Sequence, residues 1–243
     1  VSEYLYDFLD PDTVYESQAA RAKSILPETS WAYDSQTPEL GYDPVKAKSL
    51  LEVAGFPQGF DMDVWAMPVQ RAYNPNAVTM AKLIQADLKK IGVKVQIITY
   101  EWSTFLRRLS LGEHQSFLLG WSADHPDPDN FFTPMLSCSA SELGNNRTFW
   151  CNKEYDELLK KALTTSNLSK RKKYYAKAMT IINEEMPLLA IAHSKRFQAR
   201  GTNVKGKIME NFGSISFHNV AKVPVNTAIQ DLAEINKPAE VGK

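Results

Sequence analysis

The sequence predicts an α/β fold with a mainly parallel sheet flanked by helices. Between residues 60 and 121, two kinds of segment follow one another in turn. In one kind apolar and polar residues alternate, as in a strand, and in the other apolar residues recur at helical spacing. The resulting order is strand, helix, strand, helix, strand, which is typical of right-handed βαβ units with parallel strands. The chain also has 243 residues and 44% hydrophobic content, enough to bury a substantial core.

The first helix before this region has a clear start and a clear end. Asp43 can cap its free amide groups, and Pro44 suits the first helical position. Gly55 then suits the left-handed position that commonly ends a helix. We therefore expect a helix from Pro44 to the residue before Gly55.

The alternating region itself divides into five elements. We expect strands at 60–67, 93–100 and 115–121, because these segments alternate or are rich in β-branched residues. We expect helices at 76–91 and 101–113, the first with its apolar residues on one face. The three strands are predicted to share one sheet, with helix 76–91 packed on it.

The C-terminal part is predicted to contain two helices and then extended chain. Residues 152–165 and 168–186 have helical patterns that begin after asparagines. Residues 187–200 are expected to be extended and to cross between lobes, and 205–223 to form further strand and turn. The final segment, 224–243, has little patterning and predicts a loosely held tail.

Two cysteines bracket a segment rich in Ser, Gly and Asn. Cys138 and Cys151 could form a disulfide that contributes about 3 kcal/mol in the chain-entropy model. The alternative is a pair of free thiols. Zinc binding is disfavoured, because two cysteines with His193 far away in the sequence do not make a zinc pattern. A disulfide would indicate an oxidising compartment.

Charge and hydropathy narrow the function classes. The 28 basic and 28 acidic residues balance, which disfavours a protein built mainly to hold nucleic acid or an anionic membrane. No apolar run approaches the ~20 residues of a membrane-spanning helix. No signal peptide stands at the start, where Val1 opens apparently ordered sequence, so we expect a processed or truncated product.

Polar residues follow two of the predicted strands at their carboxyl ends, where open α/β sheets bind ligands. Asp124 comes just after the strand that ends in Trp121, and its carboxylate could accept hydrogen bonds from a ligand ammonium. Arg71 follows the strand at 60–67, and its planar guanidinium suits a carboxylate. Together they suit a zwitterion such as a peptide, although Arg71 could equally be a surface residue.

Other clusters of polar and charged residues give weaker indications of function. His125 and the aspartates at 124, 127 and 129 suggest a metal or hydrolytic site, but intervening prolines and the lack of a second carboxylate cluster favour structural roles for Asp127 and Asp129. The basic run 170–173 reads as a solvated helix face, with nucleic-acid contact as the minority interpretation. Neither a nucleophile elbow nor a phosphate loop is present, so we predict no catalytic residue, cofactor or metal.

Several strings occur in an order that resembles one known family. They are YDPVKAKSLLEVAGFPQGFDMDVWAMPVQRAYNPN, IQADLKKIGVKV, TYEW, LLGWSADHPDPDNFF, MLSC and FWCNKEYDELLKKA. Together they resemble the dipeptide/oligopeptide-binding family of ABC-transporter solute receptors, family 5, over residues 40–220. Within it the dipeptide binders, the haem binders and the Sap-type receptors linked to antimicrobial-peptide uptake are nearest, and the ending VKGKIMENFGSISFHNV favours the Sap type.

The resemblance implies a periplasmic-binding-protein-like lobe rather than an enzyme. Family members enclose a peptide between two large lobes and deliver it to the membrane permease of an ABC importer. Residues 1–192 would form the second large lobe, and 193–243 the hinge crossing, the return strands into the first lobe and the tail. The expected location is the periplasm. The expected partners are a peptide, the permease and the missing N-terminal lobe, with haem as an alternative ligand and no stable nucleic-acid partner.

The resemblance also implies roles for individual residues. Asp124 matches the aspartate that receives the peptide ammonium, and Arg71 matches the arginine that meets the C-terminal carboxylate. Three aromatic residues match positions near the ligand: Tyr73, Trp102 and Trp121. Cys138 and Cys151 match the family's disulfide pair. The sequence departs from dipeptide binders at 125–126, where a His-Pro pair follows the aspartate and alters the expected shape of the pocket.

Three alternatives stay open at this point, one within ligand binding and two in other function classes. Haem or another bulky ligand could occupy a large apolar pocket, with His125 or His193 as contacts. A peptidase using the 124–129 loop would turn peptides over without a partner protein. An RNA-binding or surface-binding protein using residues 170–173 would show strong salt dependence.

Overall fold

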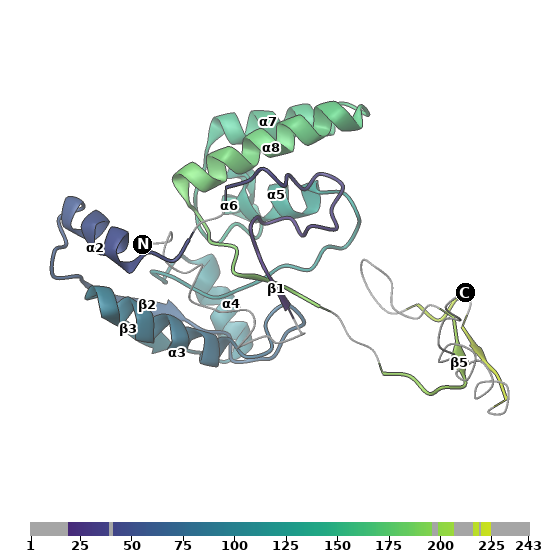
Figure 1. Cartoon of the computed structure of the whole chain (residues 1–243), viewed down its shortest axis with the longest axis horizontal. Helices are drawn as coiled ribbons and strands as arrows, with labels where there is room; N and C mark the ends of the chain where they lie inside the picture. The colour runs from purple at the N-terminus through teal and green to yellow at the C-terminus, as the bar shows by residue number, and fades with distance from the viewer. Residues whose placement is uncertain (1–18, 39–40, 196–198, 207–215, 219, 225–243) are drawn as a thin grey trace, which may run out of the picture. The chain divides into compact units, whose positions relative to one another are not determined.

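The structure is a computed structural model that describes residues 19–38, 41–195, 199–206, 216–218 and 220–224 (Figure 1). The chain divides into two compact units, Val1–Lys195 and Arg196–Lys243. The predicted assignment of residues 1–192 to the second large lobe, and of 193–243 to the hinge crossing, the return strands and the tail, stays a prediction. Most of the predicted tail, from residue 225 on, lies outside the described residues.

The helices around the predicted sheet begin at side-chain caps, of which the sequence indicates Asp43. Helix α2 (Pro44–Val53) starts where the Asp43 carboxylate accepts the Lys46 amide at 2.8 Å. Helix α3 (Ala77–Leu88) starts at Asn76 and runs into a 3₁₀ turn, η2 (Lys89–Ile91). Helix α4 (Trp102–Ser110) begins at Glu101. The predicted helices of this region are therefore confirmed, each within a few residues of its expected ends.

Two of the three predicted strands form a parallel pair. Strand β2 (Asp61–Trp65) pairs with β3 (Lys94–Ile98), and the register places Asp61 opposite Lys94 and Trp65 opposite Ile98. Helix α3 packs along β3 (Figure 1). Strand β2 is bonded on both of its edges, to β3 and to the segment 115–121, and it is therefore the central strand. The order across the sheet is β3, β2 and then the segment 115–121.

The third predicted strand, 115–121, is wrong as a regular strand. It meets β2 in one parallel bridge, Trp65 with Phe117, with the Trp65 amide bonded to the Ser116 carbonyl at 2.9 Å. On the amino-terminal side of this bridge, side-chain hydrogen bonds take the place of the backbone hydrogen bonds of a regular strand pair. The Asp63 amide donates to the Gln115 side chain at 2.7 Å, and the Gln115 amide donates to the Asp63 carboxylate at 3.0 Å. The segment still lies beside β2, as predicted.

Parallel pairing is also less extensive than the sequence suggested. Among the described residues, the two other strand pairs are antiparallel. Strand β1 (Ala19–Arg21) pairs with β4 (Ala192–Ser194), which lies within the predicted extended segment 187–200. In the second unit, β5 (Val204–Lys205) pairs with β6 (Ala221–Lys222). These short pairs join segments distant in sequence, which hydrophobic patterning alone does not reveal.

The first unit contains two apolar cores. The first lies between the sheet and helices α2, α3 and α4, with Trp65 and Phe105 among its fully buried side chains. The second joins the chain after β1 to helices α5 (Asp129–Leu136), α7 (Lys153–Leu163) and α8 (Leu168–Glu185). The helices α7 and α8 start at Asn152 and Asn167 as predicted, and they lie side by side (Figure 1).

The predicted disulfide between Cys138 and Cys151 is present, with a Cα–Cα distance of 4.5 Å. The segment that it closes is not wholly a loop, contrary to the sequence interpretation. Helix α6 (Cys138–Leu143) occupies its first half, because the Ser137 hydroxyl caps it by accepting the Ala140 amide at 3.2 Å.

The basic run 170–173 is not entirely a solvated face. The Arg171 side chain is only 13% exposed and pairs with Asp127 at 2.8 Å, in a site that also contains the Tyr175 hydroxyl. The three lysines of the run face solvent. Since the arginine of the run is engaged by Asp127, only lysines are left for the nucleic-acid contact of the minority interpretation.

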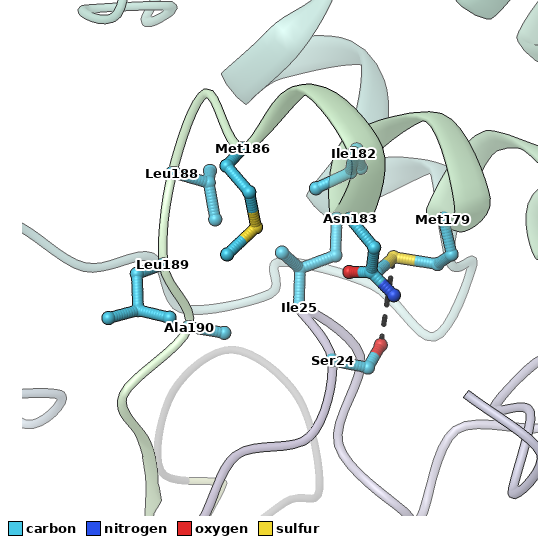
Figure 2. A pocket seen from close by; sticks show the side chains of 9 residues that line it. All are labelled: Ser24, Ile25, Met179, Ile182, Asn183, Met186, Leu188, Leu189 and Ala190. Atoms are coloured by element: carbon cyan, nitrogen blue, oxygen red, sulfur yellow. Dashed lines mark hydrogen bonds between the residues drawn. The ribbon is translucent and has the colours of Figure 1, made fainter. Parts of the chain in front are cut away.

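The carboxyl end of α8 packs on the second core with little free space. Met186 ends the helix with a left-handed backbone, at φ 49°. Figure 2 shows the side chains around it and the Ser24 hydroxyl directed at the Met179 sulfur, 3.7 Å away. The cavity that they line measures about 10 Å³, which holds one water molecule at most. No described helix is both long enough and apolar enough to cross a bilayer.

Candidate ligand-binding site

A cavity of about 900 Å³ opens in the first unit. Its lining includes residues from the loop after β2, from the segment 115–121 and its continuation, and from the extended chain before and through β4. The loop after β2 and the segment 115–121 belong to neighbouring strands of the sheet, and the strand order reverses between these two strands. Ligands of open α/β sheets bind at such a point, beyond the carboxyl ends of the strands.

All five predicted contact residues line this cavity: Arg71, Tyr73, Trp102, Trp121 and Asp124. In the sequence they lie at or after the carboxyl ends of three predicted strands: Trp102 at the start of the helix after the second strand, and the others in or next to the loops after the first and third. The parallel sheet brings these positions to one edge, because the carboxyl ends of parallel strands point the same way. Their roles in ligand binding stay predictions.

Arg71 is held between two aromatic residues rather than free at the surface. Its guanidinium carbon lies 4.4 Å from the centre of the Trp102 ring, a cation–π distance. Its amide and carbonyl exchange hydrogen bonds of 3.1 Å with Asn74, which fixes the turn after β2. Burial raises the pKa of the Tyr73 hydroxyl, and the neighbouring Arg71 charge offsets part of that rise. The guanidinium is therefore oriented before any ligand arrives.

Tyr73 packs directly on the backbone of Gly120. A Cβ added at this glycine would lie 2.3 Å from Cδ2 of the Tyr73 ring, closer than any real contact. The absence of a side chain at 120 therefore lets the Tyr73 ring rest against the segment that leads to Asp124.

We expect Gly120→Ala to destabilise the fold by about 1–3 kcal/mol, because the new methyl group must displace the Tyr73 ring. Urea denaturation gives the free energy of unfolding. In a Tyr73→Ala background the same substitution should cost much less, since the obstructing ring is gone. An equal cost in both backgrounds would show that the contact is not the reason for glycine at 120.

The loop that carries Asp124 is organised by Asn130, which the local sequence marks only as a residue of a turn or a helix cap. The Asn130 side chain is 8% exposed. Its oxygen accepts the Trp121 indole N–H and the Asp124 amide, both at 3.1 Å. Its nitrogen lies 3.2 Å from Nε2 of His125. One buried amide thus fixes three consecutive parts of the loop, a role that local sequence does not signal.

The structural roles expected for Asp127 and Asp129 agree with the geometry. Asp127 accepts two contacts from the Arg171 guanidinium, at 2.8 and 2.9 Å, and the Asp129 amide at 3.0 Å. Burial acts to raise the pKa of Asp127, but the Asp129 amide and Arg171 outweigh it and hold that pKa below its usual value. Asp129 accepts the Thr133 hydroxyl at 2.6 Å inside α5. Asp127 thus holds the loop on α8, and the Asp129 carboxylate stabilises the first turn of α5.

Asp124 differs from these neighbours. Its backbone amide is bound, but its side chain is exposed, and within the ranges that the structure describes no hydrogen bond or ion pair engages its carboxylate. The site therefore combines an available carboxylate with an oriented guanidinium in one cavity, as a zwitterionic ligand requires.

Comparison with known proteins gives the family. The model of the bacterial extracellular solute-binding proteins, family 5 Middle, matches residues 12–142, more than half of the chain. The chain belongs to this family. The family 5 resemblance carried by the sequence motifs is thereby confirmed.

Curated relatives agree with this family 5 assignment. A dipeptide-binding protein of Escherichia coli is 45% identical over 86% of this chain and 39% of its own length. Heme-binding protein A of Haemophilus influenzae is 42% identical over 86% and 38%. A Sap-type peptide transport periplasmic protein of Salmonella typhimurium is 38% identical over 86% and 38%. The chain therefore spans about two fifths of the length of these relatives.

A solved structure supports the family 5 fold. The dipeptide binding protein from a Pseudoalteromonas species, in complex with Met-Leu, is 51% identical, with a TM-score of 0.82 over 91% of this chain and 44% of that one. The predicted α/β lobe of the periplasmic-binding-protein type is confirmed.

Proposed function

We propose that this chain forms the ligand-binding lobe of a peptide receptor that serves a bacterial ABC importer. The observation that carries the proposal is one cavity with an available carboxylate, Asp124, and an oriented guanidinium, Arg71. A free peptide has an ammonium at one end and a carboxylate at the other. Charge-assisted hydrogen bonds at both ends would select peptides over uncharged solutes.

The roles of the five residues follow from their chemistry. Asp124 receives the ligand ammonium, and Arg71 binds the ligand carboxylate through its planar fork. The aromatic side chains of Tyr73, Trp102 and Trp121 supply apolar area along the ligand, and Trp102 also stacks on the Arg71 guanidinium. The relatives named as dipeptide-binding proteins, and the structure with Met-Leu, support this choice of ligand class.

The working receptor would contain a second lobe that closes over this cavity. Residues 1–192 would supply the present lobe, and 193–243 the hinge crossing and the return strands. A membrane permease would take the peptide from the closed receptor. The periplasm suits the disulfide between Cys138 and Cys151, because such bonds persist in oxidising compartments. Binding and release, rather than catalysis, would be its whole activity.

Haem or another bulky ligand is the alternative, favoured by the cavity volume of about 900 Å³ and by the haem-binding relative. Against axial ligation, His193 lies 2.9 Å from the Ser24 carbonyl oxygen. The His125 ring is approached by two N–H donors, the Asp127 amide at Nδ1 and the Asn130 side chain at Nε2, and a neutral imidazole has one acceptor nitrogen, which serves one of them. The peptide is therefore the preferred ligand.

We expect the two-lobed receptor that contains this lobe to bind free Ala-Ala and to bind N-acetyl-Ala-Ala about tenfold more weakly or worse. Acetylation removes the ammonium charge that Asp124 would accept. Isothermal titration calorimetry measures both affinities, and native mass spectrometry of the purified receptor identifies any ligand that co-purifies. Equal affinity for the two peptides, together with tight hemin binding, would contradict the proposal of a peptide ligand and favour haem as the ligand.

A further inference from the structure

The loop at 145–149 is fixed from within by Asn146, which is fully buried. The Asn146 side-chain nitrogen donates to the carbonyl oxygens of Ser137 at 3.1 Å and Trp150 at 2.8 Å. Its oxygen accepts the Thr148 amide at 3.2 Å and the Thr148 hydroxyl at 2.8 Å. The disulfide closes the same segment. A loop held in this way presents its outer side chains in a preorganised position.

Arg147 is the cation that this loop presents to the cavity. Its carbonyl oxygen lies 2.9 Å from Nε2 of His114, which must donate there because a carbonyl only accepts. Arg147 is partly buried, and across the described part of the chain no hydrogen bond or ion pair engages its guanidinium, which has five donors. A ligand carboxylate could therefore bind it without displacing a protein acceptor.

The charges around the cavity are unbalanced. Its lining contains three cationic side chains, Arg71, Arg147 and Lys195, and one anionic side chain, Asp124. A zwitterionic peptide with neutral side chains would satisfy Asp124 and Arg71 and leave Arg147 unpaired. A ligand with one further carboxylate would satisfy Arg147 as well.

We propose that Arg147 forms a second anion-binding subsite, so that the receptor prefers peptides that carry an acidic side chain. This inference rests on the proposed function, because it takes the ligand ends to be held by Asp124 and Arg71. The planar guanidinium and the carboxylate of Asp or Glu match as a two-pronged pair.

The test compares matched peptides by titration calorimetry on the two-lobed receptor. The peptides are Ala-Ala, then Glu-Ala and Ala-Glu, then their isosteric neutral partners Gln-Ala and Ala-Gln. In the unmutated receptor, one glutamate peptide should bind about tenfold more tightly than its glutamine partner, the usual effect of a hydrogen-bonded charge. Arg147→Gln should bring that ratio to about one and leave Ala-Ala affinity unchanged. Arg107→Gln, the matched control at an exposed arginine of α4 outside the cavity lining, should keep the preference.

Each other result has a definite meaning. Normal Ala-Ala binding without a glutamate preference would overturn the Arg147 subsite and leave the proposed function standing. A loss of Ala-Ala binding in Arg147→Gln equal to the loss for glutamate peptides would also overturn it, because Arg147 would then act on every ligand, for instance through the second lobe. Failure of the unmutated receptor to bind any of the five peptides would overturn the proposed function itself.

Discussion

Asp124→Ala in the two-lobed receptor is expected to weaken peptide binding by about 2–5 kcal/mol, the usual cost of removing one partner of a buried charge pair. In the closed receptor the ligand ammonium would be shielded from water, so without Asp124 it would remain unpaired at a cost of several kcal/mol. The unmutated receptor should discriminate strongly against N-acetylated peptide, and the variant should discriminate much less. Calorimetry on both proteins with both peptides measures the four affinities.

The matched control is Asp61→Ala. Asp61 begins β2, at the opposite end from the cavity, and its side chain is 80% exposed. It should change neither affinity, and both variants should unfold at the same urea concentration as the parent. If Asp124→Ala binds the free peptide as tightly as Asp61→Ala does, the carboxylate does not read the ammonium and Asp124 is only a loop residue.

Replacing both cysteines by serine is expected to lower the free energy of unfolding by about 3 kcal/mol. The two cysteines are 13 residues apart, and a loop of this size constrains the unfolded chain by roughly that amount. Urea denaturation of the parent and of the Cys138→Ser, Cys151→Ser variant measures the difference. The reduced parent serves as the control and should match the variant.

The disulfide prediction has a second part, because the bond closes the segment that carries Arg147. Buried Asn146 still holds the loop from within, so we expect the variant to bind peptide when it is folded. An unchanged free energy of unfolding in the variant would contradict the stabilising role. Retained stability together with lost binding would show that the disulfide acts on the site instead.

The sequence predicted those parts of the fold that depend on local chemistry. Asp43, Asn152 and Asn167 cap their helices as expected, since a short polar side chain satisfies the free amides of the next turn. The five contact residues reach one cavity because parallel strands align their carboxyl ends, a consequence of topology that the alternating pattern already implies.

The features that the sequence missed depend on contacts between distant residues. Segment 115–121 has strand-like residues, but the exchange between Asp63 and Gln115 replaces its backbone ladder. Arg171 belongs to a lysine-rich run, and only the approach of Asp127, 44 residues away, turns it inward. Asn130 resembles any turn asparagine until Trp121 and Asp124 are found to share its oxygen.

The pairing of β1 with β4 has a consequence for the order in which the chain folds. Ala20 lies opposite His193, so the pair joins residues near the two ends of the first unit. His193 also bonds to the Ser24 carbonyl across 169 positions, and Ser24 contacts Met179 across 155. Contacts over such distances in sequence require closure of a long loop, which slows their formation. During synthesis the sheet that carries Arg71 and Asp124 can therefore assemble from residues 61–121 before β1 finds its partner. The second core needs the chain as far as Ala190, and the β1–β4 pair forms only after Ser194 has left the ribosome.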